Sequence, residues 1–212
     1  MMRSIGKGFS LFSLWVLAAS LLSAPPLYAG APVILILGDS LSAGYGMALA
    51  DSWPRLMQER LDREGHSYRV VNASITGDTT QGGLARLPRL LERHQPEVVI
   101  IELGGNDGLR GLGIETTREN LAAMIQQSQD CGARVLLTGI QLPPNYGIAY
   151  TDRFRDMYTE LASVHGTLLV PFLMDGVALN AELMQSDGVH PNASAQPVML
   201  DNVWSALKAI LR

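Results

Sequence analysis

The feature that most constrains the fold of this chain is a regular alternation between short apolar runs and segments with helical periodicity. Strands of a parallel sheet covered by helices on both faces are typically apolar throughout, without a polar side. The alternation therefore predicts a doubly wound, three-layer α/β/α domain of the flavodoxin-like type, with about five parallel strands. The strands are expected at residues 33–37, 68–73, 98–103, 134–140 and 167–170.

The helices expected between these strands are indicated by apolar residues three or four positions apart. A glycine at position 65 suits the C-terminus of the first helix, and Thr116-x-x-Glu119 is interpreted as a capping box that opens another. Pro88 is expected to break or tighten the helix that contains it. The helices are expected at residues 53–61, 84–94, from 116 onward, 154–162 and 203–211. The helix that begins at 116 has an apolar face formed by Leu121, Met124, Ile125 and Ser128.

Residues 1–29 have the composition of a secretory signal peptide. Arg3 and Lys7 precede an apolar run from Phe9 to Leu22, which is shorter than the roughly 20 residues of a membrane-spanning helix. Cleavage after Ala29 would leave residues 30–212 as a single domain, and an uncleaved anchor is the less favoured alternative. Without the leader the chain has 14 basic and 20 acidic residues, a net charge of −6.

Composition excludes several classes of protein. The full chain of 212 residues has a net charge of −4, whereas a nucleic-acid-binding surface needs a basic surplus. Its single cysteine excludes an internal disulfide framework and a zinc site built on cysteine pairs. We expect that thiol, Cys131, to be buried and structural.

We expect the catalytic or ligand-binding residues beyond the carboxyl ends of the first and third strands, where the strand order of a flavodoxin-like sheet reverses. Ser40 follows the first strand in Gly38-Asp39-Ser40-Leu41. An isolated Gly-Asp-Ser is more often a turn or a helix cap, and a serine hydroxyl needs a neighbouring base to act as a nucleophile.

His190 is the histidine best placed to be that base. It lies in Asp187-x-x-His190, in a polar loop before the last helix, and a short loop can bring the carboxylate back onto the imidazole. A turn capped by Asp187 is an equally good interpretation of this motif alone. Gly77 and Asn106, which follow the second and third strands, could add N–H donors to that of Ser40 and form an oxyanion hole.

In this order along the chain, the motifs around Ser40, Gly77, Asn106 and Asp187-x-x-His190 resemble the four blocks of the SGNH (GDSL) hydrolase family. The resemblance extends from Val33 to Trp204. The longer segments 71–79, 83–88, 101–111 and 142–147 resemble multifunctional bacterial periplasmic members of that family, which act as acyl-CoA thioesterase, lysophospholipase, arylesterase and protease.

The resemblance implies the SGNH hydrolase fold and a catalytic triad of Ser40, His190 and Asp187. It also implies an oxyanion hole formed by Ser40, Gly77 and Asn106. The expected activity is hydrolysis of small-molecule acyl esters, thioesters and lysophospholipids by an exported, periplasmic enzyme. We expect no metal or other cofactor, no nucleic-acid partner, no stable membrane span, and a monomer.

Several assignments stay open at this stage. Asp39 or Asp107 could take the place of Asp187 as the carboxylate that orients His190, but we interpret both as carboxylates that shape their loops. Residues 109–114 and 142–150 could line a groove for an acyl chain, the first as a mobile flap, or could be ordinary loops. The alternative functions are an SGNH carbohydrate acetylesterase and a non-catalytic binding module on the same sheet.

Overall fold

The computed structural model describes Met1 and residues 30–212, and the fold begins at Ala31. Five parallel strands form one sheet in the order β2-β1-β3-β4-β5. The strand order reverses between β1 and β3, as the flavodoxin-like prediction requires. The strands are β1 (Val33–Gly38), β2 (Arg69–Asn72), β3 (Val98–Glu102), β4 (Arg134–Thr138) and β5 (Leu168–Val170).

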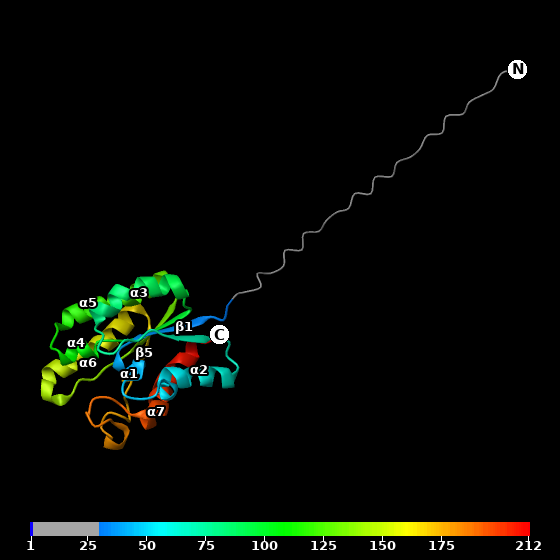
Figure 1. Cartoon of the computed structure of the whole chain (residues 1–212). Coiled ribbons are helices and arrows are strands. Elements are labelled where there is room, and N and C mark those ends of the chain that lie inside the picture. Colours follow the sequence, from blue (N-terminus) through cyan, green and yellow to red (C-terminus); the bar gives the residue numbers. More distant parts are fainter. Residues whose placement is uncertain (2–29) are drawn as a thin grey trace. The chain divides into compact units, whose positions relative to one another are not determined.

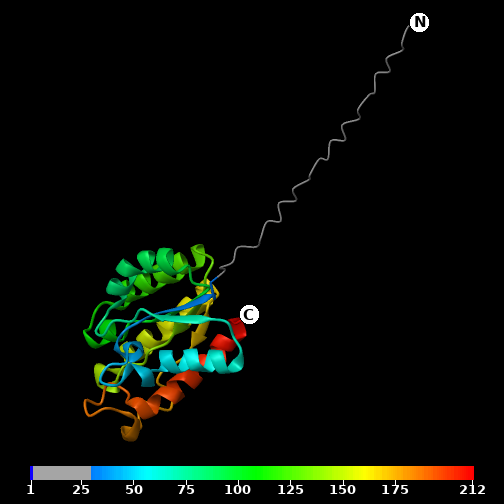
Figure 2. The same ribbon diagram turned by 45° about the vertical axis from the view of Figure 1, so that its right-hand side comes forward.

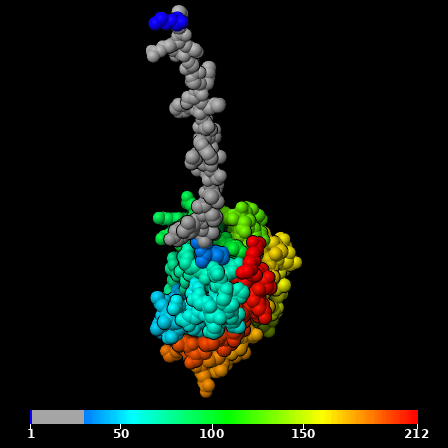
Figure 3. Space-filling model, turned by 90° about the vertical axis from the view of Figure 1, so that its right-hand side faces the viewer, coloured from blue at the N-terminus to red at the C-terminus, as the bar shows by residue number. Residues whose placement is uncertain are grey.

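Helices cover both faces of this sheet (Figures 1 and 2). The helices α3, α5 and α6 lie on one face, and α2 and α7 lie on the other. In Figure 3 the cyan segment that contains α2 lies beside the red C-terminal segment. The helices are α1 (Ser40–Ala43), α2 (Trp53–Glu64), α3 (Thr80–His94), α4 (Gly105–Leu109), α5 (Ile114–Asp130), α6 (Ile148–His165) and α7 (Gln196–Leu207), with short 3-10 turns between them.

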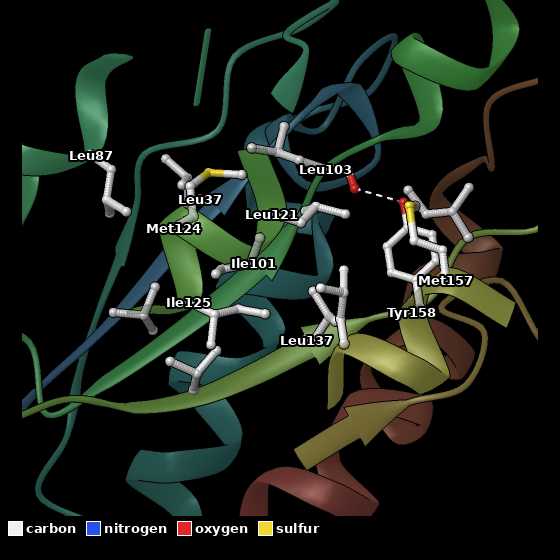
Figure 4. Packing of buried hydrophobic residues seen from close by; sticks show 14 of the residues in the cluster. Leu37, Leu87, Ile101, Leu103, Leu121, Met124, Ile125, Leu137, Met157 and Tyr158 are labelled. Atoms are coloured by element: carbon white, nitrogen blue, oxygen red, sulfur yellow. Dashed lines mark hydrogen bonds between the residues drawn. The ribbon is translucent and has the colours of Figure 1, made fainter. Parts of the chain in front are cut away.

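Alternate residues of the central strands enter two separate hydrophobic cores. Leu37 and Ile101 pack against α3, α5 and α6, while Ile36 and Ile100 pack against α2 and α7. All four side chains are fully buried, which explains why these strands are apolar throughout. Figure 4 shows the first core, in which the Tyr158 hydroxyl of α6 donates to the carbonyl of Leu103 just after β3.

Two predictions about helices were wrong. Helix α5 begins at Ile114, with Gly113 as its N-cap, so Thr116 and Glu119 lie inside the helix and form no capping box. Helix α3 begins at Thr80 and continues through Pro88. Pro88 is exposed, so water can bind the helix carbonyl that the proline ring leaves without a donor.

The prediction that Cys131 is buried was also wrong. Cys131 is exposed because it is the C-cap of α5, beyond the apolar face of that helix. That face itself is as predicted, and Leu121, Met124, Ile125 and Ser128 are buried.

The predicted signal peptide lies outside the described residues apart from Met1. Among the helices of the described part of the chain, none combines the length and the apolar character needed to cross a membrane.

Candidate active site

The candidate site forms where β1 and β3 end, at the point where the strand order reverses. Ser40 is the first residue of α1, and Asn106 lies in the first turn of α4, so short helices replace the loops expected after both strands. The N-cap of α1 is Asp39, whose Oδ1 accepts a hydrogen bond from the N–H of Leu41 at 3.0 Å. The cap fixes the direction in which α1 leaves the sheet and, with it, the position of Ser40.

His190 is carried by a loop that folds back on itself before α7. Met184 and Pro191 form an antiparallel bridge across the base of this loop, and the N–H of Gln185 donates to the carbonyl of His190 at 2.8 Å. Inside the loop, Asp187 Oδ1 accepts from the backbone N–H groups of Val189 and His190. The short loop therefore brings the Asp187 carboxylate back onto the imidazole, and Asp187 caps the turn as well.

Asp187, His190 and Ser40 form a continuous chain of hydrogen bonds. Nδ1 of His190 lies 2.7 Å from Asp187 Oδ2, and Nε2 lies 3.0 Å from Ser40 Oγ. An ionised carboxylate can only accept, so the proton of the neutral imidazole is on Nδ1. Nε2 then presents its lone pair to the Ser40 hydroxyl, which is the arrangement a general base needs.

Asp187 stays ionised over a wide range of pH. The backbone N–H of His190, followed by the His190 side chain and the N–H of Val189, stabilises the carboxylate and lowers its pKa from 3.8 to about 2. The orienting charge is therefore present under both neutral and acidic conditions.

Three N–H donors of the site are without acceptors among the described residues. They are the backbone N–H of Ser40, the backbone N–H of Gly77 and one N–H of the Asn106 amide. The other Asn106 N–H donates to Asp39 Oδ2 at 3.0 Å. Gly77 has a φ of +78°, a conformation that favours glycine in this turn. Donors without acceptors can bind an oxygen that gains negative charge.

Two buried carboxyl groups lie beneath these donors. Burial raises the pKa of Asp39 from 3.8 to about 6. Glu102, at the end of β3, is fully buried, and burial followed by the charge of Asp39 raises its pKa well above 4.5. Glu102 Oε2 accepts from the Ser42 hydroxyl at 2.6 Å and from the N–H of Asp39 at 3.2 Å. Burial therefore disfavours the ionised form of both carboxyl groups, and the Asp39 charge disfavours it further for Glu102.

Asp39 and Asp107 hold the neighbouring elements in place, as predicted, and neither has a hydrogen bond to His190. Asp107 accepts from both the N–H and the hydroxyl of Thr80, at 2.9 and 2.5 Å. It thereby fastens the start of α3 to α4. The turn containing Gly77 precedes α3 directly, so this contact also fixes Gly77 relative to Asn106.

Three residues around the site were not found by sequence reasoning. The Tyr45 ring lies against the imidazole of His190, with 4.3 Å between the ring centroids. Gln185 Nε2 donates to the carbonyls of Tyr45 and Pro191, at 2.8 and 2.9 Å, and so joins the loop after α1 to the histidine loop. Arg110 Nη2 donates to the Gly77 carbonyl at 3.0 Å and lies 3.5 Å from Asn106 Oδ1. Tyr45 and Gln185 lie outside the quoted motifs, and only the folded chain brings them to the site. Arg110 lies in the segment 101–111, but that resemblance gave it no role.

The two loops considered as an acyl-chain groove lie against each other. The Tyr146 hydroxyl donates to the carbonyl of Leu109 at 3.0 Å, and the Tyr150 hydroxyl lies 3.4 Å from the carbonyl of Gly108. Large apolar side chains of these loops are exposed to solvent, namely Leu109, Leu112, Tyr146 and Ile148. The loops thus present an apolar surface beside α4, which carries Asn106.

Across the residues that the structure describes, no three His, Cys, Asp or Glu side chains group closely enough to hold a metal ion.

Residues 36–196 match the GDSL-like Lipase/Acylhydrolase family. The chain is 52% identical to "Esterase TesA" of Pseudomonas aeruginosa over 183 residues, which cover 86% of this chain and 91% of the relative. It is 49% identical to "Arylesterase" of Vibrio mimicus, over 82% of this chain and 87% of the relative. It is also 48% identical to "Thioesterase 1/protease 1/lysophospholipase L1" of Escherichia coli, over 84% and 83% of the two chains.

Solved structures of similar proteins superpose well on this chain. The crystal structure of TesA superposes with a TM-score of 0.83 at 52% identity, covering 84% of this chain and 99% of that one. The psychrotrophic esterase EstA from Pseudoalteromonas sp., in a structure inhibited by monoethylphosphonate, superposes with a TM-score of 0.80 at 41% identity, covering 84% and 97% of the two chains.

Proposed function

The chain belongs to the GDSL-like lipase/acylhydrolase family, and on that premise we propose that it hydrolyses carboxylic esters and thioesters by acyl transfer through Ser40. The observation that carries this proposal is the hydrogen-bonded chain from Asp187 through His190 to Ser40. Its relatives at about half identity are named esterase, arylesterase and thioesterase/lysophospholipase, which supports the same reaction class.

The proposed reaction has two steps. His190 Nε2 takes the Ser40 proton while Ser40 Oγ attacks the acyl carbon, and the carbonyl π electrons move onto the oxygen. The resulting oxyanion is stabilised by the N–H groups of Ser40 and Gly77 and by the Asn106 amide. When the tetrahedral intermediate collapses, the bond from the acyl carbon to the leaving group breaks, and His190 gives its proton to the departing oxygen or sulfur, which leaves as an alcohol or thiol. Water activated by His190 then releases the acid and restores Ser40.

The proposed substrates are acyl thioesters, lysophospholipids and simple or aryl esters. The exposed apolar surface of Leu109, Leu112, Tyr146 and Ile148 supports substrates with an acyl chain, because an apolar chain gains free energy by leaving water. An SGNH carbohydrate acetylesterase would use the same five site residues, but it would have no need of this surface.

The test is a series of substrates given to the purified protein. We expect hydrolysis of p-nitrophenyl esters from acetate to laurate, of acyl-CoA and of lysophospholipid. Activity that fades sharply beyond acetyl would favour the acetylesterase. Ser40→Ala should lower kcat for every substrate by a factor on the order of 10⁶ while the protein stays folded.

A matched serine variant serves as the control for that substitution. Ser205→Ala, in α7 and away from the site, should keep full activity. Substantial turnover by folded Ser40→Ala protein would refute the proposed triad.

We further propose that the enzyme is exported to the periplasm. The basic and apolar pattern of residues 1–29 supports this location. N-terminal sequencing of the chain from cell fractions tests it. A soluble periplasmic chain that begins near Gly30 is expected, whereas a membrane-bound chain that retains Met1 or Met2 would contradict the proposal.

A further inference from the structure

Asp39 links the two parts of the proposed site that come from β1 and β3. Its side chain is buried, with 2% of the residue exposed. One carboxylate oxygen accepts from the N–H of Leu41 in α1, and the other accepts from Asn106 Nδ2 in α4, both at 3.0 Å. A single group thus contacts both the helix that begins with Ser40 and the amide assigned to the oxyanion hole.

These contacts fix the orientation of the Asn106 side-chain amide, that is, the positions of its Oδ1 and Nδ2 atoms. A carboxylate can only accept, so it holds the Nδ2 end, and Arg110 Nη2 lies 3.5 Å from the Oδ1 end. Turning the amide over would place Oδ1 against the carboxylate and Nδ2 against the guanidinium, with repulsion at both ends. The observed orientation leaves the second N–H of Nδ2 free for a substrate oxygen.

The absence of a side chain at Gly105 allows the contact between Asp39 and Asn106. A Cβ atom on Gly105 would lie 3.3 Å from Asp39 Oδ2, which is a tight contact. Glycine at this position allows the carboxylate to lie close to the first turn of α4.

We propose that Asp39 is a positioning residue, which holds the Asn106 amide with its free N–H toward the oxyanion. The proposal rests on the proposed function, because it presumes that Asn106 stabilises an oxyanion formed at Ser40. Asp39 touches neither the substrate nor the reacting atoms. Its contribution to stabilising the oxyanion is therefore made through Asn106, whereas its N-cap bond to Leu41 holds Ser40 in place.

The first test variant is Asp39→Asn. Asparagine has nearly the same shape and is an equally good N-cap, so its Oδ1 can keep the bond to Leu41. Its amide nitrogen then faces Asn106 Nδ2, and two donors meet where a donor and an acceptor met before. At pH 8, where wild-type Asp39 is ionised, we expect kcat to fall by about 10- to 100-fold with KM little changed.

The decisive measurement combines this substitution with the loss of Asn106. Asn106→Ala alone should lower kcat by about 10² to 10³. If Asp39 acts through Asn106, adding Asp39→Asn to Asn106→Ala should change kcat by less than about twofold. A further 10- to 100-fold loss in the double variant would overturn the proposal, as would an unchanged kcat or a raised KM in Asp39→Asn alone.

Two further variants distinguish loss of the contact with Asn106 from a general disturbance of the fold. Asp39→Ser keeps an N-cap oxygen but cannot reach Asn106, so it should show the same loss and the same dependence on Asn106. Glu59→Gln removes an exposed carboxylate of α2 that pairs with Arg55 and has no bond to the site, and its kcat should stay within about threefold of wild type. If Ser40→Ala abolishes turnover but Asp39→Asn does not lower kcat, the proposed function stands and this inference fails.

Discussion

At the scale of single residues, the surroundings of three carboxyl groups shift their pKa values in different ways. Asp187 has its pKa lowered to about 2 by the N–H groups of its loop, whereas burial raises that of Asp39 to about 6. Glu102, fully buried beside Asp39, has its pKa raised well above its usual range. The surroundings therefore favour the carboxylate form of Asp187 and the neutral form of Glu102.

The raised pKa of Glu102 in the folded protein predicts how the free energy of unfolding depends on pH. The folded protein keeps the Glu102 proton above pH 4.5, while the unfolded chain releases it. Stability therefore falls by about 1.4 kcal/mol for each pH unit between 4.5 and the higher pKa of the folded state. Glu102→Gln cannot ionise, so its free energy of unfolding should exceed that of wild type at pH 7.5 and match it near pH 4.

Urea unfolding of both proteins across this range measures the difference. Glu59→Gln, an exposed substitution in α2, is the matched control for the loss of a glutamate. A constant difference between Glu102→Gln and wild type at all pH values would show that Glu102 is not held neutral.

The residues expected to carry the chemistry could be predicted from sequence because short motifs contain them in a recognisable order. The structure brings Ser40, His190 and Asp187 into one hydrogen-bonded chain, but their catalytic roles stay a prediction. The residues that hold this arrangement could not be predicted. Tyr45 and Gln185 meet the histidine loop through contacts that only the folded chain creates.

At the scale of elements, the five strands were predicted to within two residues at each end because each contains a short apolar run, although both ends of β2 are polar and exposed. The starts of helices were harder to predict. A hydroxyl residue followed by an acid three positions later is also an ordinary pair inside a helix, which is how Thr116 and Glu119 occur in α5. The short helices α1 and α4 have too few residues to show a period, so they were expected to be loops.

The junction between β3 and α4 depends on Gly104. Its φ is +116°, and a Cβ there would lie 2.1 Å from the Tyr158 hydroxyl, which donates to Leu103. Gly104→Ala should lower the free energy of unfolding by about 2 kcal/mol or more, through backbone strain and this overlap.

Removing the hydroxyl tests the overlap separately from the strain. In a Tyr158→Phe background the Cβ has its nearest remaining neighbours at 3.4 Å or beyond, so Gly104→Ala should cost at least about 1 kcal/mol less. Equal costs in the two backgrounds, measured by urea unfolding, would mean that the overlap has no effect on stability.

At the scale of the domain formed by residues 31–212, the candidate site is separated from the C-terminus. The site lies at the carboxyl ends of β1 and β3, whereas the C-terminus lies toward the amino ends of the strands (Figures 1 and 2). The location of the site at the strand-order reversal followed from the alternating pattern alone. Substrate preference could not be predicted in the same way, because it depends on the loops around residues 109–114 and 142–150.

The central claim is that His190 activates Ser40 as the nucleophile of acyl transfer. The most direct measurement is reaction of the full chain with a fluorophosphonate, followed by mass spectrometry of its peptides. One adduct per chain, on Ser40, is predicted, with labelling strongly slowed in His190→Ala and absent in Ser40→Ala. An unlabelled wild-type protein, or an adduct on another residue that leaves Ser40 free, would contradict the account.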